Sequence, residues 1–170
     1  MMKKVQIARE RLLQNDGFTL IELLMVVIIL GILAAVVIPQ FTSSSEDAKV
    51  SALKSNLNGI RGALELYLVQ HDGKYPDPNN FEAQLTQYTD QSGNVSRTKT
   101  TTYKYGPYLK QGFPKNPFAK AEVADQITID SALTTIGTVA ADAADPNNPG
   151  WKYVSKTGEF IANTTGYDQY

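Results

Sequence analysis

A long apolar run near the N-terminus constrains this chain more than any other feature. Residues 18–38 have the sequence FTLIELLMVVIILGILAAVVI, in which only Thr19, Glu22 and Gly31 are not apolar. A helix of this length extends about 31 Å, which matches the hydrocarbon thickness of a bilayer. An apolar run of this length is typical of a membrane-spanning helix rather than of a core helix in a soluble domain.

The segment before the span is short and basic. Its charged side chains are Lys3, Lys4, Arg9 and Arg11 against Glu10 and Asp16, a net charge of +2. Because a basic flank marks the cytoplasmic end of a span, we expect the residues beyond 38 on the outer side of the membrane. The alternative is a cleaved secretory signal peptide followed by a secreted domain, with a weak cleavage site among the serines at 43–45.

Composition excludes several functional classes. The chain has no cysteine, which excludes disulfides, thiolate metal sites and a cysteine nucleophile. Its 170 residues suit one domain, and a net charge of −1 gives no sign of a nucleic-acid binder. The single histidine, His71, is interpreted as a surface residue at a helix end, where it would interact with the helix dipole. No phosphate loop or GxSxG motif accompanies it, so the sequence predicts neither an enzyme nor catalytic residues.

Glu22 is an ionisable side chain about one turn inside the apolar run. Such a group costs on the order of 3 kcal/mol at the centre of a bilayer, and less near its edge. No cation lies within helical reach on the same span. Cleavage between Gly17 and Phe18 would create an α-amine at a similar depth. We hypothesise that this amine meets Glu22 of a neighbouring chain, because the one-turn offset favours an axial stagger between subunits.

The segment GFTLIELLMVVIILGILAAVVIPQF, residues 17–41, resembles the N-terminal segment of type IV pilins and type II secretion pseudopilins. The resemblance implies that a prepilin peptidase cuts after Gly17 on the cytoplasmic face and N-methylates Phe18. It also implies that Glu22 is needed for methylation or for subunit docking. In the same family, the positions of Gly31 and Pro39 weaken the helix.

Beyond the span, residues 39–71 are predicted to form the amphipathic half of one long helix. Pro39 lacks an N–H and clashes with the preceding turn, and Gly31 lowers helix propensity, so a kink or local break is expected near them. Asp72 and Gly73 are expected to end the helix. Apolar residues repeat at spacings of three and four, at Leu53, Leu57, Ile60, Leu64 and Tyr67 or Leu68.

Residues 72–170 are predicted to form a loop-rich region that ends in an antiparallel sheet over the apolar face of the helix. The fold class is therefore α+β and type IV pilin-like. The polar stretch 89–102 is expected to be a surface loop. The other expected elements are a short helix over 81–88 with Asn79 or Asn80 as N-cap, a strand over 126–130, and a hairpin of 151–154 and 159–162 about a turn at 155–158.

A second resemblance concerns these outer residues. YGPYL, FPKNPF and GWKYVSKTGEFIAN are similar to parts of the G-type major pseudopilin of type II secretion. That resemblance implies a calcium ion in a late Asp- and Gly-rich loop. The aspartates between residues 119 and 150 lack the compact spacing that calcium requires, so solvated surface carboxylates are favoured over a calcium site and no other cofactor is expected. These aspartates are Asp125, Asp130, Asp142 and Asp145.

Together these observations predict a non-catalytic structural subunit that waits in the inner membrane and polymerises into a pseudopilus for protein export across the outer membrane. The implied partners are further copies of the chain, prepilin peptidase, other pseudopilins and an inner-membrane assembly platform. Two alternatives stay open: a type IV pilus subunit for adhesion, twitching motility or DNA uptake, and a membrane-anchored binding domain without an assembly role. The expected organisation is a removed leader at 1–17, a transmembrane assembly helix at 18–38, the amphipathic helix half at 39–71 and the globular region at 72–170.

Overall fold

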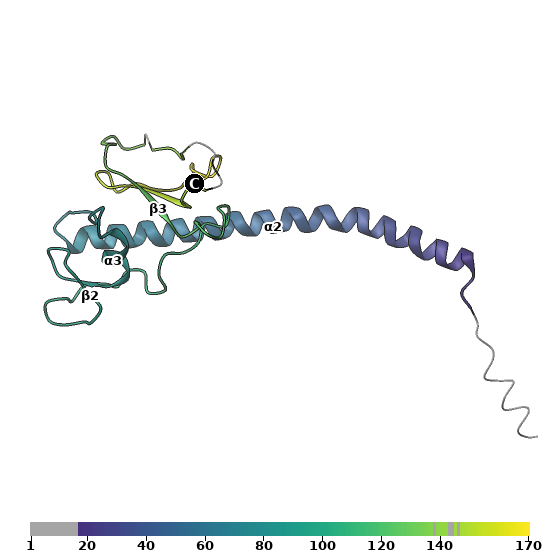
Figure 1. Ribbon diagram of the computed structural model, residues 1–170, viewed down its shortest axis with the longest axis horizontal. Helices are drawn as coiled ribbons and strands as arrows, with labels where there is room; N and C mark the ends of the chain where they lie inside the picture. Colours follow the sequence, from purple (N-terminus) through teal and green to yellow (C-terminus); the bar gives the residue numbers. More distant parts are fainter. Residues whose placement is uncertain (1–16, 138, 143–144, 146) are drawn as a thin grey trace, which may run out of the picture. The chain divides into compact units, whose positions relative to one another are not determined.

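The computed structural model describes residues 17–137, 139–142, 145 and 147–170, without the side chains of residues 39 and 41–43 (Figure 1). Most of the predicted leader, residues 1–16, therefore lies outside the described residues. The chain divides into two compact units, Met1–Ser45 and Glu46–Tyr170, and each is considered by itself.

One helix, α2, runs from Leu20 to Gln70 without interruption. Within the first unit its stretch Leu20–Ile38 is long and apolar enough to cross a membrane, and none of this stretch is buried inside the protein. The local break predicted near Gly31 and Pro39 is not present as an interruption of α2, and the kink predicted as its alternative stays a prediction. Helix formation is cooperative, so the intrahelical hydrogen bonds on both sides can carry the helix across one missing N–H and one glycine.

The second unit is built on the C-terminal half of α2. The predicted apolar face is confirmed, because its side chains are at most 2% exposed and belong to the hydrophobic core. The helix ends where predicted: Gly73 N–H donates to the Leu68 carbonyl at 2.9 Å, and both Asp72 and Gly73 have positive φ. This is the geometry of a Schellman C-cap. The buried side chains of this face are Leu53, Leu57, Ile60, Leu64 and Tyr67.

A three-stranded sheet packs its aromatic side chains into the same core. The strands are β3 (Ile127–Asp130), β4 (Trp151–Val154) and β5 (Phe160–Ala162), in the order β3-β4-β5. The predicted hairpin is confirmed, since β4 and β5 are antiparallel with Tyr153 opposite Phe160. In contrast, β3 pairs with β4 in parallel, so the sheet is mixed rather than wholly antiparallel. The long connection from residue 131 to 150 allows this, because parallel neighbours need a crossover of a dozen or more residues.

The region between α2 and β3 holds more structure than its sequence suggests. Helix α3 spans Phe81–Thr86, somewhat shorter than predicted, and Asn80 precedes it without a side-chain capping bond. The stretch 89–102 was predicted to be a surface loop. Part of it instead forms a small antiparallel hairpin with strands β1 (Tyr88–Thr89) and β2 (Val95–Ser96). Asp90 Oδ1 accepts hydrogen bonds from the backbone of Ser92 and Asn94 and closes the turn.

His71 is buried, which corrects its interpretation as a surface residue. Its side chain is 2% exposed, and its ring stacks on Tyr67 with centroids 3.7 Å apart. Nδ1 carries a proton because it lies 2.9 Å from the Tyr67 carbonyl, which can only accept. Nε2 is 3.0 Å from Thr89 Oγ1, so the ring ties the end of α2 to β1. Because residues 89–102 are polar, their sequence did not indicate that Thr89 would contact His71.

The turn of the β4–β5 hairpin requires a glycine at position 158, and this requirement can be tested. Gly158 has φ +77°, and a Cβ built there would overlap the ring of Tyr75. Gly112 has a nearly equal φ of +79°, but a Cβ there meets no atom within 4 Å. We expect Gly112→Ala to cost about 1–2 kcal/mol for the left-handed backbone, and Gly158→Ala to cost roughly 1–3 kcal/mol more for overpacking.

Thermal unfolding of the full chain in detergent, followed by circular dichroism, measures both variants against the unmodified chain. Because the two glycines have nearly equal positive φ, the difference between the variants reports mainly on the contact with Tyr75. Equal shifts in melting temperature would show that Tyr75 moves aside without cost.

Candidate assembly site at the start of the long helix

The start of α2 is closed by a reciprocal capping arrangement between Thr19 and Glu22. The Thr19 N–H and its Oγ1 donate to Glu22 Oε2 at 2.8 and 2.7 Å, and the Glu22 N–H donates to Thr19 Oγ1 at 3.3 Å. A Thr followed three residues later by a Glu is the sequence signature of a capping box. This capping role was not predicted from the sequence although the signal was present, because Glu22 was considered as a charge in an apolar run and as a docking or methylation residue.

The capping box places the Glu22 carboxylate in the first turn of α2, where unpaired N–H groups give the helix end a partial positive charge. The bonds from Thr19 also replace some of the water that a carboxylate would lose in an apolar environment. The structure thus holds Glu22 at a defined position at the head of the apolar stretch. Its partner in another subunit stays a prediction.

Gly17 and Phe18, the predicted cleavage and methylation residues, precede α2 and have no regular secondary structure. Both are exposed, and 81% of Phe18 is accessible. A peptidase needs an accessible backbone that is free of helical hydrogen bonds, and these two residues meet that requirement. Phe18 precedes Glu22 by four residues in the chain, and Thr19, the capping partner of Glu22, follows Phe18 directly.

The apolar side chains that follow are exposed along the stretch Leu20–Ile38. Those of Leu20, Ile29 and Ile38, for example, are 83%, 53% and 64% accessible. An apolar surface this long has to be covered by lipid or by other protein chains. The candidate site is therefore an exposed apolar surface that begins at a capped carboxylate, and it is not a pocket.

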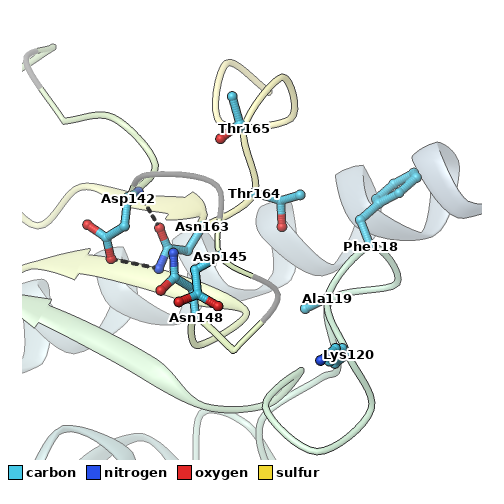
Figure 2. Close-up of a pocket in the computed structure, with 9 residues that line it drawn as sticks. All are labelled: Phe118, Ala119, Lys120, Asp142, Asp145, Asn148, Asn163, Thr164 and Thr165. Atoms are coloured by element: carbon cyan, nitrogen blue, oxygen red, sulfur yellow. Dashed lines mark hydrogen bonds between the residues drawn. The ribbon is translucent and has the colours of Figure 1, made fainter.

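The four aspartates considered for calcium do not form a common cluster. Asp130 Oδ1 accepts from the backbone of Ala132 and Leu133 at 2.8 and 3.1 Å. Asp142 forms an ion pair with Lys152, and the hydrogen bond from Lys152 holds the pKa of the Asp142 carboxyl below its usual range. Asp142 and Asp145 line one pocket of about 290 Å³ (Figure 2). Asp125 lines a different pocket.

Comparisons with known proteins find a family motif over the same segment. The family described as "Prokaryotic N-terminal methylation motif" matches residues 13–38. A protein named "Type II secretion system core protein G" from Pseudomonas aeruginosa is 52% identical over 54 residues, which cover 32% of this chain and 38% of that protein. A protein of the same name from Vibrio cholerae is 27% identical over 140 residues, covering 80% of this chain and 87% of that protein.

A third relative, "Type IV major fimbrial protein FimA" from Dichelobacter nodosus, is 30% identical over 159 residues, with 89% of each chain covered. The comparison with solved structures gave no match. An apolar N-terminal helix that begins with a methylation motif and continues into a small α+β unit defines a membrane-anchored, pilin-like subunit. The chain belongs to the family of type IV pilins and type II secretion pseudopilins.

Proposed function

We propose that the chain is a non-catalytic structural subunit that polymerises into a type II secretion pseudopilus and supports protein export across the outer membrane. The observation that carries this proposal is the similarity to a type II secretion system core protein G over 80% of the chain. The exposed apolar helix Leu20–Ile38 supports it, because a filament of packed helices would cover that surface.

The proposed maturation starts at the cytoplasmic face of the inner membrane. Prepilin peptidase removes residues 1–17 and methylates the new N-terminus at Phe18. The basic leader supports this orientation, and the match to the methylation motif supports the processing step. The second unit then lies on the periplasmic side, where other pseudopilins and the assembly platform meet it.

In the proposed filament, Glu22 sets the stagger between subunits. The capping box holds the carboxylate in the first turn of α2, close in sequence to the α-amine that cleavage creates at Phe18. When an incoming chain places its Phe18 amine near Glu22 of a neighbour, the two opposite charges form a pair in an apolar environment. There, such a pair is strongly preferred to two unpaired charged groups. Apolar packing supplies the attraction, and this pair supplies the register.

A second candidate function is a type IV pilus subunit. It is favoured by the relative from Dichelobacter nodosus, which is 30% identical and aligns over 89% of both chains. The two functions share processing and assembly, and they differ in whether the filament stays in the envelope or reaches the cell surface.

Mass spectrometry of the native protein from the membrane fraction tests the proposal first. We expect a chain that begins at Phe18 and carries one additional methyl group. A chain that begins at Met1, or one cut among residues 43–45, would contradict assembly by a processed helix. Deletion of the gene then separates the two filaments: loss of secreted proteins with intact twitching supports the pseudopilus, and the reverse supports the pilus.

A further inference from the structure

A compact polar network joins Asp142, Lys152 and Asn163. Lys152 Nζ donates to Asp142 Oδ1 at 2.7 Å, and Asn163 Nδ2 donates to Asp142 Oδ2 at 2.9 Å. The backbone N–H of Asp142 donates to Asn163 Oδ1 at 2.7 Å. The side chains of Lys152 and Asp142 are 12% and 35% exposed and Asn163 is 5% exposed, so the network is partly buried.

The three residues come from separate parts of the second unit. Asp142 lies in the connection between β3 and β4, Lys152 lies in β4, and Asn163 follows β5. Figure 2 shows Asp142 turned toward Asn163, with both of their mutual hydrogen bonds drawn. The network therefore fastens the connection to two neighbouring strands at one point.

These residues do not fit the calcium ion that the resemblance to G-type pseudopilins implies. Calcium takes six to eight oxygen ligands, usually several carboxylates. Both carboxylate oxygens of Asp142 already accept N–H donors, one of them a cationic ammonium that would repel a divalent ion. Within the part of the chain that the structure describes, no group of three or more His, Asp or Glu side chains could hold a metal ion.

We infer that the Lys152 ammonium supplies the positive charge that holds the β3–β4 connection against the sheet, so that this subunit folds without a divalent ion. The ammonium neutralises Asp142. Asn163 holds the same residue through two bonds, one donated to the carboxylate and one accepted from the Asp142 backbone N–H. This inference concerns the second unit alone, and it holds whether the filament is a pseudopilus or a pilus.

The test is thermal unfolding of the full chain in detergent, with excess EDTA and with millimolar calcium chloride. We expect the unmodified chain to melt at the same temperature in both. Lys152→Met should lower the melting temperature by roughly 3–8 °C, since it leaves a half-buried carboxylate without its cation. Lys152→Arg should retain most of the stability. Lys156→Met, at an exposed lysine in the neighbouring turn, is the matched control and should change nothing.

Two results would overturn the inference: a rise in the melting temperature of the unmodified chain with calcium, or equal behaviour of Lys152→Met and Lys156→Met. If Lys152→Met does not fold, Asp142→Asn replaces it, because the amide keeps the shape of the carboxylate and removes its charge. We expect that variant to melt lower as well. Calorimetric titration of the unmodified chain with calcium should give no binding heat, and a saturable heat would equally overturn the inference.

Discussion

Glu22→Gln is expected to reduce the amount of assembled filament at least about tenfold while leaving the subunit in the membrane. Glutamine can replace glutamate at this position of a capping box, so the cap that Thr19 forms at the start of α2 is preserved. The amide has no charge, however, and cannot pair with the α-amine of a neighbouring chain. Loss of about 1.4 kcal/mol per contact is already a tenfold change in association, and a pair in an apolar environment exceeds that. Sheared filaments and secreted protein, both quantified on gels, measure the effect.

Two further variants separate the roles of Glu22. Glu22→Ala removes the cap and the charge together, and we expect it to assemble no better than Glu22→Gln. Glu122→Ala removes a carboxylate from the exposed surface of the second unit and should assemble normally. Mass spectrometry of the Glu22→Gln chain shows whether Phe18 is still methylated, which distinguishes a role in methylation from one in docking. Normal filaments from Glu22→Gln would exclude the charge pair as the source of register.

The parts of the fold that were predictable from the sequence are those encoded in short, periodic patterns. The apolar repeat of α2 and the hairpin of β4 and β5 each depend on neighbouring residues, and both are confirmed. The parallel pairing of β3 with β4 and the burial of His71 depend on contacts between distant segments. A polar stretch such as 89–102 carries no local sign that Thr89 will be buried against the histidine that follows the helix.

The helix break that was predicted near Gly31 and Pro39 shows how far local helix propensity can be used. Each residue weakens a helix by itself, yet α2 continues through both positions in the described subunit. The cost of one lost hydrogen bond is smaller than the cost of ending a helix and starting another, since nucleation fixes several residues for a single bond. A residue with low helix propensity therefore need not mark the end of a helix.

Of the substitutions outside the assembly helix, Trp151→Ala is expected to have the largest effect on folding. Trp151 is fully buried in the central strand β4, its Nε1 donates to the Pro114 carbonyl at 2.8 Å, and its ring lies 5.5 Å from that of Phe160. Removing a buried tryptophan costs about 3–5 kcal/mol, a large share of the roughly 5–15 kcal/mol that stabilises a typical domain. We expect the second unit to melt at least about 10 °C lower and to become sensitive to protease.

The controls for this variant follow from the same contacts. Trp151→Phe keeps most of the apolar volume but leaves the Pro114 carbonyl without its donor, so we expect a smaller loss of about 1–3 kcal/mol. Val69→Ala, at a side chain that is 78% exposed on α2, should change the melting temperature little. Membrane extraction should be unchanged in all three variants, because the apolar stretch Leu20–Ile38 belongs to the other unit. Trp151 is the largest side chain that the sheet contributes to the core. If Trp151→Ala instead melted like Val69→Ala, the stability of the second unit would have to come from the α2 face and not from the sheet.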